Sequence, residues 1–184
     1  MKIREKKLKM ELQSGDIKLR PFKISDGPRL VELANNENIS RNLRDGFPNP
    51  YTLQDAETFL QKYMFLDPPS VFAIEFKGEY VGNISLVKGH DVYRKSAEVG
   101  YFIGEEYWNK GIATTALNLI CEYGFNNLDI VRIHTGVYEH NLASQRVLEK
   151  CGFEKEGIFK MAVFKKEMLW NEVRYAKIVE NLKS

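Results

Sequence analysis

The hydrophobic residues of this 184-residue chain follow two spacings, and each spacing predicts a different kind of element. Short apolar stretches, several of them alternating with polar residues, are typical of strands. They are "DIKLRPF" (16–22), "SVFAIEF" (70–76), "YVGNISLV" (80–87), "SAEVGYFI" (96–103), "IVRIHTGVY" (130–138), "GIFKMAVF" (157–164) and "LWNEVRYAKIV" (169–179). Elsewhere apolar residues return every three or four positions, which is the spacing of a helix with one buried side. Helices are therefore expected over about 25–34, 52–63, 111–125 and 141–153.

Local signals indicate where these helices begin and end. Ser25 is a candidate N-cap for the first helix. Thr52, with Asp55 three residues later, predicts a capping box at the start of the second helix. Gly152 is expected to take the left-handed position that ends the last helix. The intervening stretch "NNENISRNLRDGFPNPYT" (35–52) is rich in Asn and Pro and predicts an aromatic loop.

The order of the elements predicts one α/β domain. The short connections "KGE" (77–79) and "KKEM" (165–168) predict two antiparallel hairpins. The strand–helix–strand–helix–strand order between them implies some parallel pairing. We expect a single domain over residues 15–184, preceded by a basic arm over residues 1–14.

Composition narrows the classes of partner. The formal net charge is only +2, which argues against nucleic acid as the main partner. No apolar stretch is long enough to span a bilayer and no signal peptide is recognised, so we expect no membrane association. The two cysteines, Cys121 and Cys151, are isolated and lack metal-ligand spacing. We therefore expect no metal site, and buried free thiols in a reducing cytoplasm.

The stretch "YWNKGIATTALNLICEYGF" (107–125) contains the strongest chemical signal. Its helix begins at a glycine, Gly111, and carries no acidic residue before Glu122, although first turns usually hold Asp or Glu. The positive end of the helix dipole and its unpaired N–H groups are therefore left for an anion. The spacing matches neither a P-loop nor a dinucleotide fingerprint. The alternative interpretation is an ordinary glycine turn.

Together with "GYFI" before it and "NLASQRVLEKCGF" after it, this segment resembles the acetyl-CoA motif of the GNAT N-acetyltransferases. The closest patterns are those of ribosomal-protein N-terminal acetyltransferases and spermidine acetyltransferases. The resemblance implies a mixed, mainly antiparallel sheet with splayed strands flanked by helices, and acetyl-CoA as cosubstrate. It also implies that backbone amides of the turn hold the CoA pyrophosphate, with Trp108 at a position where the family usually has Gln or Arg. The residues concerned are Trp108, Asn109, Lys110, Gly111, Ile112, Ala113 and Thr114.

The strand before the turn has an implied role as well. Gly100 within a strand is typical of a bulge or a close backbone approach. The resemblance implies that this strand splays from its neighbour. Backbone groups of Phe102, Ile103 and Gly104 would then pair with the pantetheine amides, and the thioester would lie in the gap between the strands.

Acetyl transfer to an amine needs a base for the amine and a donor for the departing thiolate. Glu98, on the splayed strand, is the preferred base candidate, and His134 on the next strand is the alternative. Asn141 is interpreted either as a helix N-cap or as a contact to the cosubstrate. Many relatives have a tyrosine acid seven residues after this asparagine, but here that residue is Leu148. The departure directs attention to Ser144, as a hydrogen-bond donor to the leaving sulfur.

The acceptor is expected to enter over the 35–52 loop and the final hairpin, between Phe47, Tyr51 and Trp170. We therefore expect an N-acetyltransferase for a primary amine, with a slight preference for a protein N-terminal α-amine. A small amine, such as a polyamine, amino sugar or amino acid, is the alternative acceptor. Asn171, where relatives commonly have Asp, weakens the polyamine assignment. A non-catalytic acyl-CoA sensor is the alternative function, and formation of a homodimer is left open.

Overall fold

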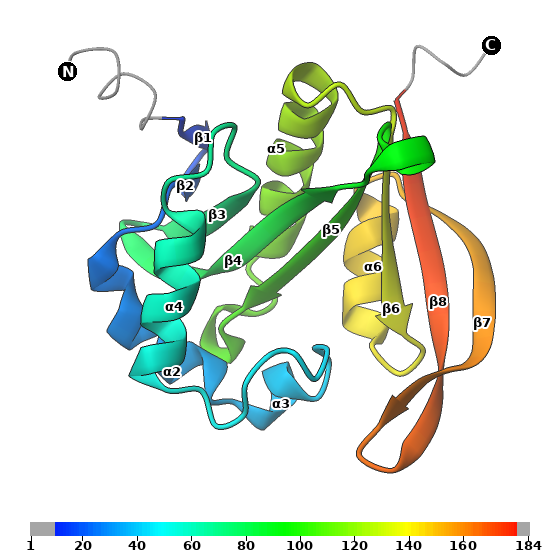
Figure 1. Cartoon of the computed structure of the whole chain (residues 1–184), viewed down its shortest axis with the longest axis horizontal. Coiled ribbons are helices and arrows are strands. Elements are labelled where there is room, and N and C mark those ends of the chain that lie inside the picture. Colours follow the sequence, from blue (N-terminus) through cyan, green and yellow to red (C-terminus); the bar gives the residue numbers. More distant parts are fainter. Residues whose placement is uncertain (1–9, 180–184) are drawn as a thin grey trace. The chain divides into compact units, whose positions relative to one another are not determined.

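The computed structural model describes residues 10–179 (Figure 1). Its strands are β1 (Leu12–Ser14), β2 (Ile17–Arg20), β3 (Val71–Phe76), β4 (Glu79–Lys88), β5 (Ser96–Ile103), β6 (Arg132–Tyr138), β7 (Glu154–Lys165) and β8 (Met168–Ile178). Its α-helices are α2 (Gly27–Ala34), α3 (Glu37–Ser40), α4 (Leu53–Tyr63), α5 (Ile112–Asn127) and α6 (Leu142–Lys150). Short 3-10 turns are η1 (Ile24–Asp26), η2 (Asp91–Tyr93) and η3 (Glu105–Tyr107). No helix in residues 10–179 is long and apolar enough to cross a membrane.

The chain folds into two compact units. The first comprises residues 1–85 and 101–120, and the second comprises residues 86–100 and 121–184. The strand order is β1-β2-β3-β4-β5-β6-β8-β7, in which β5 pairs with β6 in parallel. The predicted fold class, a mixed and mainly antiparallel sheet with helices, is confirmed.

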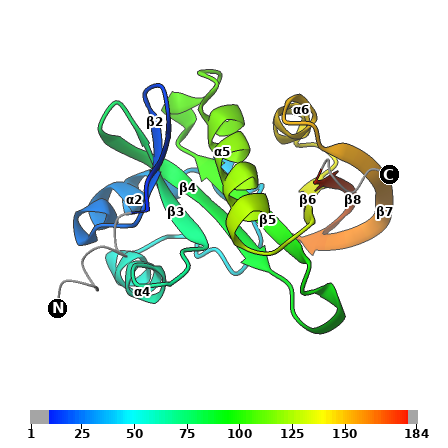
Figure 2. The ribbon, with the colours of Figure 1, turned by 90° about the horizontal axis from the view of Figure 1, so that it is seen from above.

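In the first unit, β1 to β4 pair antiparallel in sequence order. Figure 2 shows α2 and α4 lying together on one side of these strands. Large apolar side chains fill the interior and are almost completely buried: Leu19, Phe72, Ile74, Leu30 and Leu60. The buried guanidinium of Arg20 is held by two carboxylates, Asp26 at 2.8 and 2.9 Å and Glu75 at 2.6 Å. A buried cation is tolerated because its hydrogen bonds are satisfied by opposite charges.

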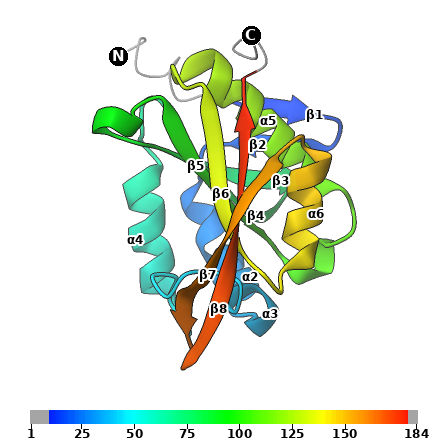
Figure 3. The same ribbon diagram turned by 90° about the vertical axis from the view of Figure 1, so that its right-hand side faces the viewer.

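In the second unit, β6 pairs antiparallel with β8, and β8 pairs antiparallel with β7. Figure 3 shows β7 and β8 as a long twisted ribbon. The apolar interior includes Ile133, Leu148 and Tyr175, each at most 1% exposed. The hydroxyl of Tyr175 reaches α6 and donates to Glu149 at 2.9 Å, which ties the helix to the sheet.

Several local predictions are confirmed. Thr52 and Asp55 form a reciprocal capping box at the start of α4. Gly152 follows α6 with φ +79°, as expected for a left-handed C′ residue. The "KGE" and "KKEM" connections both form tight turns between antiparallel strands.

Three local features differ from prediction. Ser25 does not cap a helix, because it lies inside η1, and the carboxylate of Asp26 accepts from the Lys23 N–H instead. The 35–52 stretch contains the short helix α3, which is capped by Asn36. Within the predicted basic arm, residues 12–14 form β1 on β2, whereas residues 1–9 lie outside the described part of the chain.

Candidate functional site

The glycine turn before α5 has the features of an anion-binding backbone. Asn109 and Gly111 both take positive φ angles, +60° and +77°. A Cβ placed on Gly111 would meet no protein atom within 4 Å, so this side of the turn faces open space. The first turn of α5 contains no acidic residue. The first N–H groups of a helix have no intrahelical partner, and so this turn can offer them to a phosphate.

Trp108 supports the turn from within. Its indole N–H donates to the carbonyl oxygen of Ile103 at 2.7 Å, which links the turn to the end of β5. The side chain is nevertheless 41% exposed, so part of the ring stays available for contact. The Lys110 ammonium lies 5.1 Å from the centre of the Tyr107 ring, in a cation–π contact. Trp108 therefore has a structural role that explains how the turn keeps its shape without Gln or Arg at this position.

At the end of β5, two of the backbone groups expected to meet the cosubstrate are engaged within the protein. The Gly104 N–H donates to the Val81 carbonyl at 2.9 Å, so it is already paired inside the protein. The Ile103 carbonyl already accepts from Trp108. Gly82 of β4 packs closely here, because a Cβ on it would lie 2.1 Å from the Phe102 carbonyl oxygen. A cosubstrate that pairs with the Gly104 N–H or the Ile103 carbonyl would therefore share or replace these backbone contacts.

The two carboxylates of the turn η3, just before the glycine turn, are both held by partners in the first unit. Glu105 accepts hydrogen bonds from the side chains of Asn36 and Asn38, at 2.6 and 2.9 Å. Glu106 pairs with Arg29 of α2, whose guanidinium also donates to the Tyr107 hydroxyl at 3.0 Å. Sequence reasoning missed these anchors, because the pairs are 67 to 78 residues apart and show no periodic signal.

Two of the predicted acceptor-wall residues lie together in the first unit. The rings of Phe47 and Tyr51 have centroids 5.1 Å apart, and Phe47 also packs edge-to-face on Phe102 at 5.7 Å. Tyr51 is only 5% exposed, and burial raises the pKa of its hydroxyl to about 12. Tyr51 thus acts mainly as a support in the interior, and half-buried Phe47 is the more accessible ring.

In the second unit, the two base candidates lie side by side on neighbouring strands. Glu98 of β5 and His134 of β6 are opposite residues in the parallel register, which covers residues 96–98 and 132–134. Desolvation lowers the pKa of His134 below its ordinary value, and the charge of Glu98 partly opposes this effect. The two candidates therefore lie next to each other on one face of the sheet, where the charge of Glu98 acts on the His134 imidazole.

Asn141 and Ser144 are also joined. The Asn141 side-chain oxygen accepts from the Ser144 backbone N–H at 3.2 Å, which makes Asn141 the N-cap of α6. Ser144 therefore lies in the first turn of α6, and its contact with Asn141 uses the backbone N–H. Leu148, one turn further on, is completely buried. No phenol can replace it without displacing core atoms.

Trp170 of β8 belongs to an aromatic cluster in the same unit. Its ring lies 5.5 Å from Tyr138 and 4.6 Å from His140, measured between centroids. The neighbouring carboxylate of Glu172 is buried over Gly136 and pairs with Arg174 at 2.8 Å. The β6–β8 register places Glu172 opposite Tyr138, in the row that contains His134. Glu172 was not among the candidates, because strand alternation places it on the face opposite Asn171.

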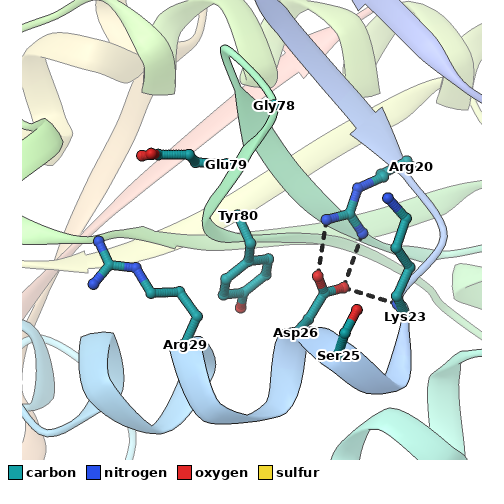
Figure 4. Close-up of a pocket in the computed structure, with 8 residues that line it drawn as sticks. All are labelled: Arg20, Lys23, Ser25, Asp26, Arg29, Gly78, Glu79 and Tyr80. Carbon is teal, nitrogen blue, oxygen red and sulfur yellow. Dashed lines mark hydrogen bonds and ion pairs between the residues drawn. The ribbon is translucent and has the colours of Figure 1, made fainter.

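A surface pocket of the first unit lies elsewhere. A pocket of about 410 Å³ is lined by Arg20, Lys23, Ser25, Asp26, Arg29, Gly78, Glu79 and Tyr80 (Figure 4). Most of its charges pair inside the protein, Arg20 with Asp26 and Arg29 with Glu32 and Glu106. None of the sequence-predicted site residues lines this pocket, and we assign it a structural role.

Comparison with known proteins gives consistent matches. A family model described as an acetyltransferase (GNAT) domain matches residues 16–154. The uncharacterised N-acetyltransferase YnaD of Bacillus subtilis strain 168 is 29% identical over 175 residues, covering 93% of this chain and 98% of its own. The spermidine N(1)-acetyltransferase of Escherichia coli K12 is 31% identical over 142 residues, covering 77% of this chain and 74% of its own. The fold matches that of RimL, a ribosomal L7/L12 α-N-protein acetyltransferase solved with coenzyme A, with a TM-score of 0.82, 22% identity and coverage of 93% and 99%.

Proposed function

The chain belongs to the GNAT acetyltransferase family, and on that premise we propose that the amine it acetylates is the α-amine of a protein N-terminus. The chain is an N-acetyltransferase, and acetyl-CoA is its acetyl donor. The residues of the glycine turn fit this donor, because an open, acid-free helix start suits a pyrophosphate. Residues 108–114 would hold the phosphates, Phe102 to Gly104 would contact the pantetheine, and Asn141 would contribute from α6.

The α-amine assignment depends on two positions of α6 taken together: a serine at 144 and a buried leucine at 148. Ser144 lies in the first turn of α6, and the position where many relatives have a tyrosine acid is filled by an interior leucine. This combination resembles the ribosomal-protein subgroup. An α-amine has a reference pKa of about 8, compared with about 10.4 for a lysine-type amine, so it needs less help to lose its proton.

In the proposed reaction the neutral amine attacks the thioester carbonyl carbon, the new C–N bond forms, and the C–S bond breaks. Glu98, directly or through water, takes the proton from the amine, with His134 beside it as the alternative acceptor. Ser144 donates a hydrogen bond to the departing sulfur. A covalent acetyl-cysteine is disfavoured, because both thiols are buried and burial raises the pKa of Cys121 to about 12.

A matched acceptor panel tests the proposal. Acetyl-CoA turnover would be measured with a short peptide bearing a free N-terminus, with the same peptide blocked at its N-terminus but containing lysine, and with spermidine. We expect the highest kcat/KM with the free N-terminus, and mass spectrometry should place the acetyl group on the α-amine. Faster turnover of the blocked peptide or of spermidine would contradict the α-amine assignment.

One observation favours a second candidate acceptor. The spermidine enzyme of E. coli is 31% identical over most of both chains, which supports a polyamine substrate. Against it, the side chain of Asn171 is uncharged and contacts protein groups. The sensor alternative predicts a different result. Acetyl-CoA would stabilise the protein, but none of the amines in the panel would cause release of CoA.

The cellular setting is proposed on chemical grounds. Cys121 and Cys151 are both free thiols in the structure, and this supports the cytoplasm, where thiols stay reduced. Assembly as a homodimer is retained as a proposal that sedimentation analysis of the purified chain would test.

A further inference from the structure

Glu139 and Asn171 form a paired contact at the point where the chain leaves β6. One carboxylate oxygen of Glu139 accepts from the backbone N–H of Asn171 at 3.0 Å, and the other accepts from its side-chain NH₂ at 2.9 Å. The backbone N–H of Glu139 donates to the Asn171 carbonyl at 3.0 Å. Three hydrogen bonds thus join two residues that are 32 positions apart.

The same Asn171 side chain also holds β7. Its oxygen accepts from the backbone N–H of Met161 at 2.9 Å. Met161 has a φ of +52° and lies where the β7–β8 register shifts, between Phe159 and Val163. The amide can satisfy both neighbours in one orientation only, because Glu139 can only accept and the Met161 N–H can only donate. An Asp at this position would lose the donor and set two carboxylates against each other.

The pair is continuous with the turn that leads into α6. The Glu139 carbonyl accepts from the Gln145 side chain of α6 at 3.0 Å. The next residue, His140, packs its ring on Trp170, which directly precedes Asn171. Asn141, the N-cap of α6, follows immediately and accepts from the Ser144 N–H. The Glu139–Asn171 pair therefore ties this turn to β8, and through Met161 to β7.

We propose that Glu139 and Asn171 are positioning residues that fix the start of α6, and with it Ser144 and Asn141, for acetyl transfer. The inference rests on the proposed roles of those two residues. It explains why Asn replaces Asp at position 171 in this chain, since the amide is needed to bridge a carboxylate and a backbone donor. It also takes Asn171 out of acceptor recognition, since both polar atoms of its side chain are already engaged.

The test is an exchange of the two chemical groups. Asn171→Asp puts two carboxylates face to face, and Glu139→Gln puts two NH₂ donors, or an NH₂ and a backbone N–H, face to face. Each single variant should lower kcat by about ten- to a hundredfold, as expected when reacting groups are misplaced by about 1 Å, with a smaller effect on the KM for acetyl-CoA. The double variant restores one donor facing one acceptor, with the polarity reversed. It should recover kcat to within about threefold of wild type.

Asn127→Asp provides the matched control, because it introduces the same charge at the end of α5, where the amide donates to the Tyr123 carbonyl. It should leave kcat within about twofold of wild type. A double variant that is no better than the worse single variant would overturn the proposal. Full activity in both single variants would overturn it as well.

A measurement that does not depend on turnover tests the positioning role separately from the α-amine assignment. Hydrogen–deuterium exchange over residues 138–146 of the free protein should be faster in each single variant and return toward wild type in the double variant. If that pattern appears while no N-terminal peptide is acetylated, the α-amine assignment fails and the positioning role stands. Unchanged exchange in both single variants would overturn the positioning role, whichever amine is the substrate.

Discussion

At the residue scale, the backbone and the side chain of Ser144 have separate roles. Its backbone N–H is used by the Asn141 cap, while the proposed chemistry uses its hydroxyl. The two roles can be separated, because a change to alanine keeps the backbone contact and removes only the hydroxyl.

Ser144→Ala should therefore lower turnover while leaving stability and acetyl-CoA binding nearly unchanged. Negative charge develops on the sulfur only as the C–S bond breaks, so the lost contact affects the transition state most. One neutral hydrogen bond is worth about 0.5–1.5 kcal/mol, which corresponds to a loss of up to about tenfold in kcat. Steady-state kinetics and thermal melts check both parts. Full activity on a verified acceptor would show that the sulfur leaves without this hydroxyl.

His134 allows a prediction about pH. Its pKa in the folded protein lies below the ordinary value of 6.5, mainly through desolvation. The unfolded chain therefore binds this proton more readily, and stability falls as the pH drops below about 6.5, toward the lower folded value. His134→Gln removes this loss.

As the pH is lowered from 7.5 to 5.5, the Tm of the wild type should therefore fall by more than the Tm of His134→Gln. Thermal melts at matched ionic strength measure it, with His90→Gln as the control on the exposed side of the second unit. A pH-independent difference would contradict the burial effect assigned to His134.

At the element scale, the start of α5 concentrates the donor-binding chemistry. Gly111→Glu places a negative charge at an acid-free helix start, where it would repel the pyrophosphate and compete for the N–H groups. Wild type should gain about 5–10 °C in Tm at a hundredfold excess of acetyl-CoA over Kd, and the variant should gain almost nothing.

Gly15→Glu is the matched control for that change. Gly15 also has a positive φ, +57°, and a Cβ on it would meet nothing within 4 Å, so the same backbone strain and charge are introduced far along the sequence from α5. It should keep the full acetyl-CoA shift. Equal shifts in wild type and Gly111→Glu would remove the glycine turn from the proposed site.

The elements differ in how well they could be predicted from the sequence. The strands, the α4 capping box and the glycine ending of α6 were predictable, because each depends on residues within a few positions of one another. β1 is only three residues long and α3 only four, too short for a periodic signal. The role of Asn171 was not predictable, because it depends on Glu139, 32 positions away, and on an irregularity in β7.

At the scale of the whole molecule, the two cysteines report when the second unit opens. Both are buried in the second unit, Cys121 at 2% and Cys151 at 3% exposure, and burial raises the pKa of both thiols. Reaction with a disulfide reagent needs an exposed thiolate. In native conditions both thiols should react slowly, and in denaturant two equivalents should react at once.

Acetyl-CoA should slow this labelling further, because a ligand that binds only the folded state lowers the population of open states. Absorbance of the released thiol reagent measures the rate with and without the cosubstrate. Fast native labelling of either cysteine would contradict the burial described above.

The two tryptophans give the molecule a built-in pair of optical reporters. The chain has only two, and Trp108 lies in the first unit beside the glycine turn, whereas Trp170 lies in the second unit against His140. Replacing either one by phenylalanine leaves a single tryptophan emitter, Trp108 in the first unit or Trp170 in the second. Emission from Trp108 would then follow occupation of the donor turn, and emission from Trp170 would follow the state of the Glu139–Asn171 pair, so fluorescence could time the two events separately within one turnover.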